Sequence, residues 1–114
     1  MTIEQISQLL DAPIICGEER KDHEIDMAFA SDLMSDVLTL SEDNVMLITG
    51  LANLQALRTA EMSEIHAIVF GRGKIISEEM RELAEENNII VLQCRYSVFK
   101  ICGLLFREGI SPVF

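Results

Sequence analysis

The stretch that decides the fold runs from Val45 to Lys74 and reads VMLITGLANLQALRTAEMSEIHAIVFGRGK. It opens with a continuous apolar run from Val45 to Thr49, which has the length of a buried strand and is broken by Gly50. Apolar residues then recur at helical spacing from Leu51 to Met62, and a second apolar run, Ile65 to Phe70, ends at another glycine. A strand, a helix and a strand in this order predict a right-handed βαβ unit of a parallel sheet.

The same alternation continues toward the C-terminus. Ser77 opens an amphipathic helix to Asn87, and Ile89 to Gln93 is another uninterrupted apolar strand. Ser97 caps a last helix that ends at Gly109, a residue type suited to the left-handed end of a helix. The segment after it, Ile110 to Phe114, is unusually apolar.

The N-terminal part repeats the pattern with shorter elements. Thr2 and Gln5 form a capping box in front of a first helix. Two short apolar runs, Ile14 to Cys16 and Ile25 to Ala30, are typical of strands. We therefore expect one domain over residues 1–114, with a three-layer α/β/α architecture and a mostly parallel central sheet in which these N-terminal strands are peripheral or antiparallel.

Composition restricts the class of partner. The chain has 19 acidic and 9 basic residues and a formal net charge of −10, so it lacks the basic surface that binds nucleic acid or an anionic membrane. No run of about 18 uncharged apolar residues is present, which argues against a membrane span. The three cysteines form no CxxC pair, and their odd number favours reduced thiols and a cytoplasmic location. The high hydrophobic share of 49% favours a homodimer that covers surplus apolar surface.

The candidate ligand site lies where the predicted strands end, because ligands of open parallel sheets collect beyond the carboxyl ends of the strands. Three basic residues fall on that edge of an acidic chain, which suits a phosphate or carboxylate ligand. The alternative is that these residues are ordinary helix caps and solubilising charges. The expected ligand-binding residues are Thr49, Gly50, Asn53, Arg72 and Lys74, with Ser31 and Asp32 bordering the site and able to cap a short helix.

No catalytic or metal-binding motif is visible. The Gly-Arg-Gly-Lys string at 71–74 matches neither a P-loop nor a dinucleotide fingerprint. Asp32 and Asp36, four residues apart, are either paired carboxylates or a solvated helix turn. His23 and His66 share no metal-ligand spacing with each other or with a cysteine. We expect no enzymatic activity, no metal and no cofactor.

Several segments resemble a known family. The segment Gly17 to Leu38, GEERKDHEIDMAFASDLMSDVL, resembles the signature of the DRTGG domain family, and LITGLAN at 47–53, AIVFGRGK at 67–74 and the final helix also look familial. Domains of this family occur alone or between CBS domains of some pyrophosphatases, and are similar to the N-terminal domain of HPr kinase/phosphorylase. The resemblance implies a three-layer α/β fold, a dimer and a non-catalytic regulatory role.

Three functional hypotheses follow. The first is a regulatory or adaptor module that senses a small anionic ligand or nucleotide, or docks on a partner enzyme. The second is an interaction domain without a ligand that uses Ile110 to Phe114. The third is a small phosphate-handling enzyme, whose general base would have to be Asp32, Asp36, His23 or His66.

Overall fold

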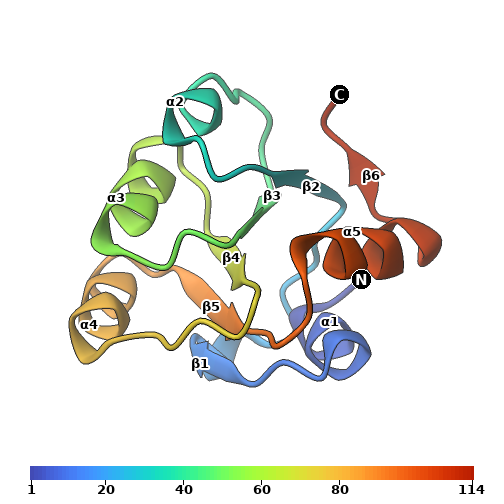
Figure 1. Ribbon diagram of the computed structural model, residues 1–114, viewed down its shortest axis with the longest axis horizontal. Coiled ribbons are helices and arrows are strands. Elements are labelled where there is room, and N and C mark those ends of the chain that lie inside the picture. Colours follow the sequence, from blue (N-terminus) through green and yellow to red (C-terminus); the bar gives the residue numbers. More distant parts are fainter.

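The structure is a computed structural model that describes all 114 residues, and its helices and strands alternate along most of the chain (Figure 1). The strands are β1 (Ile14–Cys16), β2 (Met27–Ala30), β3 (Val45–Thr49), β4 (Ala67–Phe70), β5 (Ile90–Gln93) and β6 (Ser111–Pro112). The α-helices are α1 (Ile3–Leu10), α2 (Met34–Val37), α3 (Leu54–Met62), α4 (Glu78–Glu86) and α5 (Val98–Arg107), and a 3₁₀ turn covers Glu18–Arg20.

All six strands form one sheet in the order β1-β5-β4-β3-β2-β6. Strands β2 to β5 are parallel neighbours that follow one another across the sheet, so right-handed crossovers place α2, α3 and α4 on the same face. Helix α5 returns the chain over the other face to β6, which pairs with β2, and α1 packs beside α5 (Figure 1). Strand β1 is antiparallel to β5. The predicted three-layer α/β architecture and the peripheral, antiparallel position of β1 are confirmed, whereas β2 is parallel to both of its neighbours and does not form the edge of the sheet.

The core has two halves because the side chains of the central strands alternate between the two faces of the sheet. Along β3, Val45 and Leu47 point toward α2, α3 and α4, whereas Met46 and Ile48 point toward α1 and α5. Phe70 of β4 is 0% exposed and is the largest fully buried side chain. Burial on both faces is the reason that these strands read as continuous apolar runs.

The helix starts follow the capping chemistry that the sequence indicates. The Thr2 hydroxyl accepts from the Gln5 amide while the Gln5 side chain accepts from the Thr2 amide, which is the predicted capping box. The hydroxyls of Ser77 and Ser97 accept amide hydrogen bonds at the starts of α4 and α5. The starts of these three helices were therefore predicted correctly from the sequence.

Other boundaries differ from the prediction. Helix α3 begins at Leu54 and not at Leu51, because the Asn53 side chain accepts from the Ala56 amide and fixes the helix start there. Neither Ser31 nor Asp32 caps α2, since its N-cap is Leu33, which makes no side-chain cap bond. The apolar segment after Gly109 contributes the short strand β6, which the sequence did not predict.

The N-terminus and the C-terminal strand are hydrogen-bonded to the two consecutive residues just before β2. The Met1 carbonyl oxygen accepts from the Ile25 amide at 2.7 Å, and the Met1 ammonium donates to the Ile25 carbonyl at 3.1 Å. The Ser111 amide donates to the Asp26 carbonyl at 2.9 Å. The N-terminus and the C-terminal strand therefore share one anchor.

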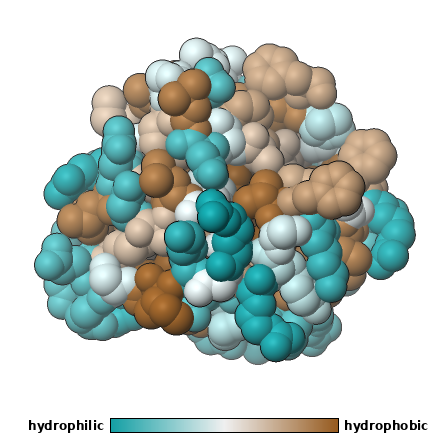
Figure 2. All heavy atoms as spheres, viewed as in Figure 1, coloured by the Kyte–Doolittle hydropathy of each residue, from teal (hydrophilic) through white to brown (hydrophobic).

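The surface is mixed, and exposed apolar side chains occur on both sides of the sheet. Figure 2 shows apolar spheres over the part of the molecule that carries α5, β6 and the C-terminal segment, and others over the part that carries α2, α3 and α4. Three of the most exposed large hydrophobic side chains, Phe99, Phe106 and Phe114, belong to α5 and the segment after it. None of the helices has the length and hydropathy that crossing a bilayer requires.

Candidate functional site at the carboxyl edge of the sheet

The site is built from the segments that follow β2, β3 and β4. Asp32 comes two residues after β2, and its Oδ1 accepts from the Thr49 hydroxyl at 2.9 Å and from the Gly50 amide at 2.8 Å. The Thr49 oxygen accepts in turn from the Leu51 amide at 3.1 Å. Asp32 therefore caps the carboxyl end of β3. Its two hydrogen-bond donors belong to the last residue of that buried strand and to the residue after it.

The hydrogen bonds keep Asp32 ionised. The Gly50 amide and the Thr49 hydroxyl lower the pKa of Asp32 below its ordinary value of 3.8, and the positive charges of Arg72 and Lys74 lower it further. The carboxylate thus carries a full negative charge at neutral pH. Its second oxygen, Oδ2, accepts no hydrogen bond from the protein and is open to an outside donor.

Arg72 lies beside this carboxylate, over Gly50. A Cβ on Gly50 would stand 2.8 Å from the Arg72 Cδ and 3.6 Å from the Asp32 Oδ2, so the Arg72 side chain lies directly against the Gly50 backbone and would have to move if this residue had a side chain. The Arg72 amide donates to the Tyr96 carbonyl at 2.8 Å, and the Gly73 amide donates to the Cys94 carbonyl at 3.0 Å. These bonds hold the loop after β4 against the loop after β5, with Arg72 at a left-handed φ of 66°.

The predicted ligand residues divide into two groups. Arg72 and Lys74 are exposed and take part in no ion pair, so their charges are available. By contrast, Asn53 caps α3, and the Ser31 hydroxyl bonds to the Leu33 backbone. The third basic residue of this edge, Arg95, is paired with Asp11 at 2.9 Å.

Thr49 and Gly50 are also engaged. Thr49 is 0% exposed, and its hydroxyl hydrogen and the Gly50 amide are both used by Asp32. An anionic ligand would have to displace the Asp32 carboxylate to reach these two donors. Thr49 and Gly50 therefore hold the Asp32 carboxylate in place. The side chains open to a ligand are those of Asp32, Arg72 and Lys74.

An open hollow next to these side chains was not predicted. It lies between the N-terminal ends of α3 and α4, has a volume of about 510 Å³, and includes Asn53, Gln55, Ile75 and Ser77 in its lining. Ile75 directly follows Lys74 and is 78% exposed. An apolar residue next to a glycine-rich loop is the signal in the sequence that points to this hollow. The amides of two helix starts face it, but Glu79 in the first turn of α4 also belongs to its lining and adds a negative charge.

The residues considered for catalysis do not meet. His23 Nε2 is 2.8 Å from Asn44 Oδ1, just before β3, and His66 directly precedes β4, so both histidines lie at the amino ends of the strands. Asp36 lies on α2 and Asp32 at the carboxyl edge. The structure has no group of three or more His, Cys, Asp or Glu side chains that could hold a metal ion.

Comparison with known proteins identifies the family of this chain. The DRTGG domain family matches residues 5–107. No curated protein sequence matches the chain. Among solved structures, the CBS and DRTGG domains of the regulatory region of Clostridium perfringens pyrophosphatase, complexed with its activator diadenosine tetraphosphate, superimpose with a TM-score of 0.76 at 18% identity. That match covers 96% of this chain and 47% of the other, so the chain spans about half of its length. With most of its residues inside the match, and with the three-layer fold in common, the chain belongs to the DRTGG domain family.

Proposed function

We propose that this chain is a non-catalytic regulatory module, folded as one domain over residues 1–114, that senses a small anionic ligand at the carboxyl edge of its sheet. The observation that carries the proposal is the set of unpaired charges around Gly50, where Arg72 and Lys74 stand beside the ionised Asp32 without an ion pair. The related pyrophosphatase structure is that of a regulatory region in complex with a nucleotide activator, which supports a ligand of this class.

The charges of the site favour a ligand with both phosphate and hydroxyl groups. Arg72 and Lys74 suit phosphate oxygens, since guanidinium and ammonium groups form charge-assisted hydrogen bonds with them. The free Oδ2 of Asp32 accepts a hydroxyl hydrogen but repels a bare anion. A nucleotide or a sugar phosphate can place phosphate oxygens against Arg72 and Lys74 and a sugar hydroxyl against Asp32. Inorganic phosphate has no sugar hydroxyl for Asp32.

The alternative function, a phosphate-handling enzyme, has less support. A general base needs a pKa near the working pH, but the hydrogen bonds on Asp32 lower its pKa. The other candidate bases lie at the far edge of the sheet or on α2, away from Arg72 and Lys74. The arrangement therefore supports binding without turnover.

The proposal also includes a cellular location, an oligomeric state and a target of regulation. The buried thiols of Cys16 and Cys94 and the absence of a disulfide suit the reducing cytoplasm. We propose a homodimer, and either a ligand alone or a partner enzyme as the target of regulation. The similarity to the N-terminal domain of HPr kinase/phosphorylase stays a prediction.

Calorimetric titration with nucleotides, sugar phosphates and inorganic phosphate tests the binding proposal. We expect at least one phosphorylated hydroxyl compound to bind and Arg72→Ala/Lys74→Ala to weaken its binding by about a hundredfold, because two contacts of about 1.5 kcal/mol each are lost. The matched variant Lys21→Ala/Arg58→Ala removes the same charge elsewhere and keeps the affinity. Equal affinity in both double variants would remove the proposed site.

Incubation of the wild-type protein with each bound compound and Mg²⁺, followed by a phosphate-release assay, separates a sensor from an enzyme. We expect binding without release. Sustained release that is lost in Asp32→Asn would favour the enzyme instead.

A further inference from the structure

We propose that the ligand of the carboxyl-edge site is a guanine nucleotide, with its phosphate at Arg72 and Lys74 and its base in the open hollow between the starts of α3 and α4. The inference rests on the proposed function, because it extends the same site and narrows its ligand from phosphorylated hydroxyl compounds to one class. We call this hollow the base site; its lining includes Gln55, Ile75 and Glu79.

The first observation is that the base site is continuous with the charged site. Ile75 of the lining directly follows Lys74 on the loop after β4. On the loop after β3, Ala52 of the lining follows Gly50 by two residues, which separates their Cα atoms by at most about 7 Å. A ligand whose phosphate binds Arg72 and Lys74 is therefore placed to extend its other end into the hollow.

The second observation is the size of the base site and its apolar wall. Its volume of about 510 Å³ lies within the range of about 300–1,000 Å³ of small-molecule sites, and four of its eight lining residues are hydrophobic. Ile75 is 78% exposed, so the fold itself leaves this apolar side chain in water. The flat face of a purine would cover it, whereas a sugar phosphate has no apolar face of that size.

The third observation is Glu79, the only charged side chain of the lining. It is exposed and takes part in no ion pair. Its negative charge repels phosphate, so the charges of the site orient the ligand, with phosphate at Arg72 and Lys74 and an uncharged base at Glu79. Because a carboxylate accepts hydrogen bonds and donates none, it binds a base edge that carries N–H groups.

Guanine is the base whose edge fits a carboxylate. Its N1–H and its exocyclic N2 amino group are adjacent donors, and the two oxygens of Glu79 can accept from both. Adenine has its N6 amino donor next to the N1 acceptor, whose lone pair a carboxylate repels. Gln55, which is exposed in the same lining, carries an amide that can donate to the guanine O6. The side chains of the base site therefore favour guanine over adenine.

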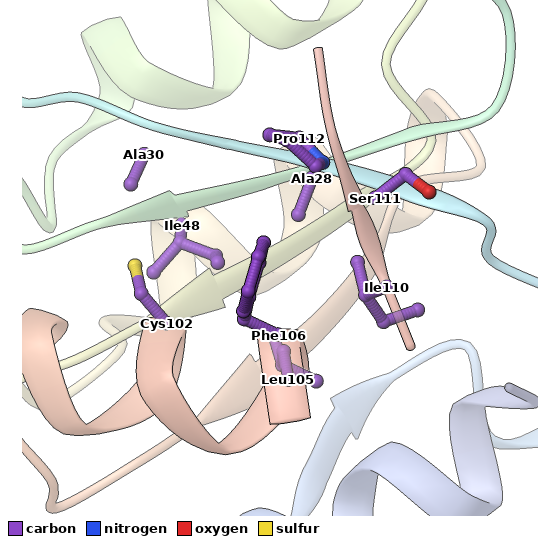
Figure 3. Close-up of a pocket in the computed structure, with 9 residues that line it drawn as sticks. All are labelled: Ala28, Ala30, Ile48, Cys102, Leu105, Phe106, Ile110, Ser111 and Pro112. Carbon is purple, nitrogen blue, oxygen red and sulfur yellow. The ribbon is translucent and has the colours of Figure 1, made fainter. Parts of the chain in front are cut away.

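The other apolar hollow of the chain does not fit this ligand. It lies between α5 and the strands β2, β3 and β6, has a volume of about 180 Å³, and is on the face of the sheet opposite to α3 and α4. Figure 3 shows Cys102 and Phe106 of α5 on one side of it, with Ile48 and Ala28 of the strands opposite. Its lining contains no charged side chain, so it offers no partner for a phosphate or for the N–H edge of guanine.

Calorimetric titration with four probes that carry the same phosphate tests the inference: the 5′-monophosphates of guanosine, inosine and adenosine, and ribose 5-phosphate. We expect guanosine monophosphate to bind at least about tenfold more tightly than ribose 5-phosphate, which lacks the base. It should also bind about tenfold more tightly than inosine monophosphate, which lacks only the exocyclic amino group, because one hydrogen bond to a charged acceptor is lost. Adenosine monophosphate should bind more weakly than guanosine monophosphate.

The variant Glu79→Gln replaces two acceptors by one acceptor and one donor, which matches the edge of adenine. We expect its affinity for guanosine monophosphate to fall about tenfold and its affinity for adenosine monophosphate to rise. The matched variant Glu86→Gln removes the same charge from the end of α4, outside the lining, and should keep the preference for guanine. Circular dichroism confirms that both variants are folded.

The outcomes separate this inference from the proposed function. Equal affinities for guanosine monophosphate and ribose 5-phosphate, or a preference for guanine that survives Glu79→Gln, would overturn the base site. If that binding is still lost in Arg72→Ala/Lys74→Ala, the proposed phosphate site stands without the base site. If none of the four probes binds, the base site and the proposed function fall together.

Discussion

Replacement of Asp32 by Ala is expected to destabilise the protein by about 2 kcal/mol. The change removes two hydrogen bonds to a charged acceptor, from the Thr49 hydroxyl and the Gly50 amide. Hydrogen bonds to charged groups contribute about 1.5–3 kcal/mol each, and we reduce the total for the two bonds to about 2 kcal/mol because Asp32 is exposed and water can replace it in part. For a domain of this size the loss corresponds to a fall in Tm of about 10 °C.

The variant Asp32→Asn separates the charge from the geometry. Its amide oxygen can still accept from both donors, so we expect a loss of only about 1 kcal/mol. The lowered pKa of Asp32 also sets a pH window: its contribution is fully present above the ordinary value of 3.8 and is lost as the pH falls from there through the pKa in the folded protein. Asp32→Asn lacks this part of the pH dependence.

Urea unfolding at pH 7 and at pH 3 measures these differences. The Asp32→Ala/Thr49→Val double variant should show a coupling energy of about 1 kcal/mol, since both single changes remove the same 2.9 Å hydrogen bond. If Asp32→Ala changes the free energy of unfolding by less than about 0.5 kcal/mol, the usual scatter of surface substitutions, then Asp32 does not hold the end of β3 and our reasoning is refuted.

Three further predictions concern other parts of the fold. Gly17→Ala should cost more than about 2 kcal/mol in denaturant unfolding, because φ is 91° and the new Cβ would lie 3.1 Å from the Ile90 backbone; a neutral result would contradict this geometry. Phe70→Ala should cost about 3–5 kcal/mol in the same assay, since the side chain is fully buried, and a smaller loss would mean that the core collapses around the gap. Burial raises the pKa of the Cys16 and Cys94 thiols, so thiol titration at pH 8 should modify them only after unfolding, and fast reaction of either in the folded state would contradict their burial.

The parts of the fold that the sequence predicted are those set by local residues. Val45 to Thr49 and Ile89 to Gln93 are apolar runs buried on both faces, and such runs have few alternatives to a central strand. Ser77 and Ser97 cap helices through bonds to amides three residues away. Because capping and strand burial depend on residues close together in the chain, the sequence alone is enough to predict these elements.

The errors came from contacts between distant residues. Asp32 was expected to cap the following helix, but it bonds to Thr49 and Gly50, which are 17 and 18 residues away. Strand β6 contains Pro112 and exists because β2 offers a free edge, which no local pattern of Ser111–Pro112 indicates. The candidate site was chosen because ligands of parallel sheets bind beyond the ends of the strands. Which of its residues are free to bind a ligand depends on hydrogen bonds that sequence spacing does not reveal. Arg72 and Lys74 are free, whereas the hydrogen-bonding groups of Thr49, Gly50, Asn53 and Ser31 are already used.

The shared anchor of both chain ends at Ile25 and Asp26 has a mechanical consequence. A force applied between the termini would act first on the few hydrogen bonds that join Met1 to Ile25 and Ser111 to Asp26. The parallel strands β2 to β5 would carry load only after those bonds had broken. Tension between the two ends would therefore strain these bonds before it reached the part of the sheet that positions Asp32 and Arg72, while the buried side chains of α1 resist its detachment.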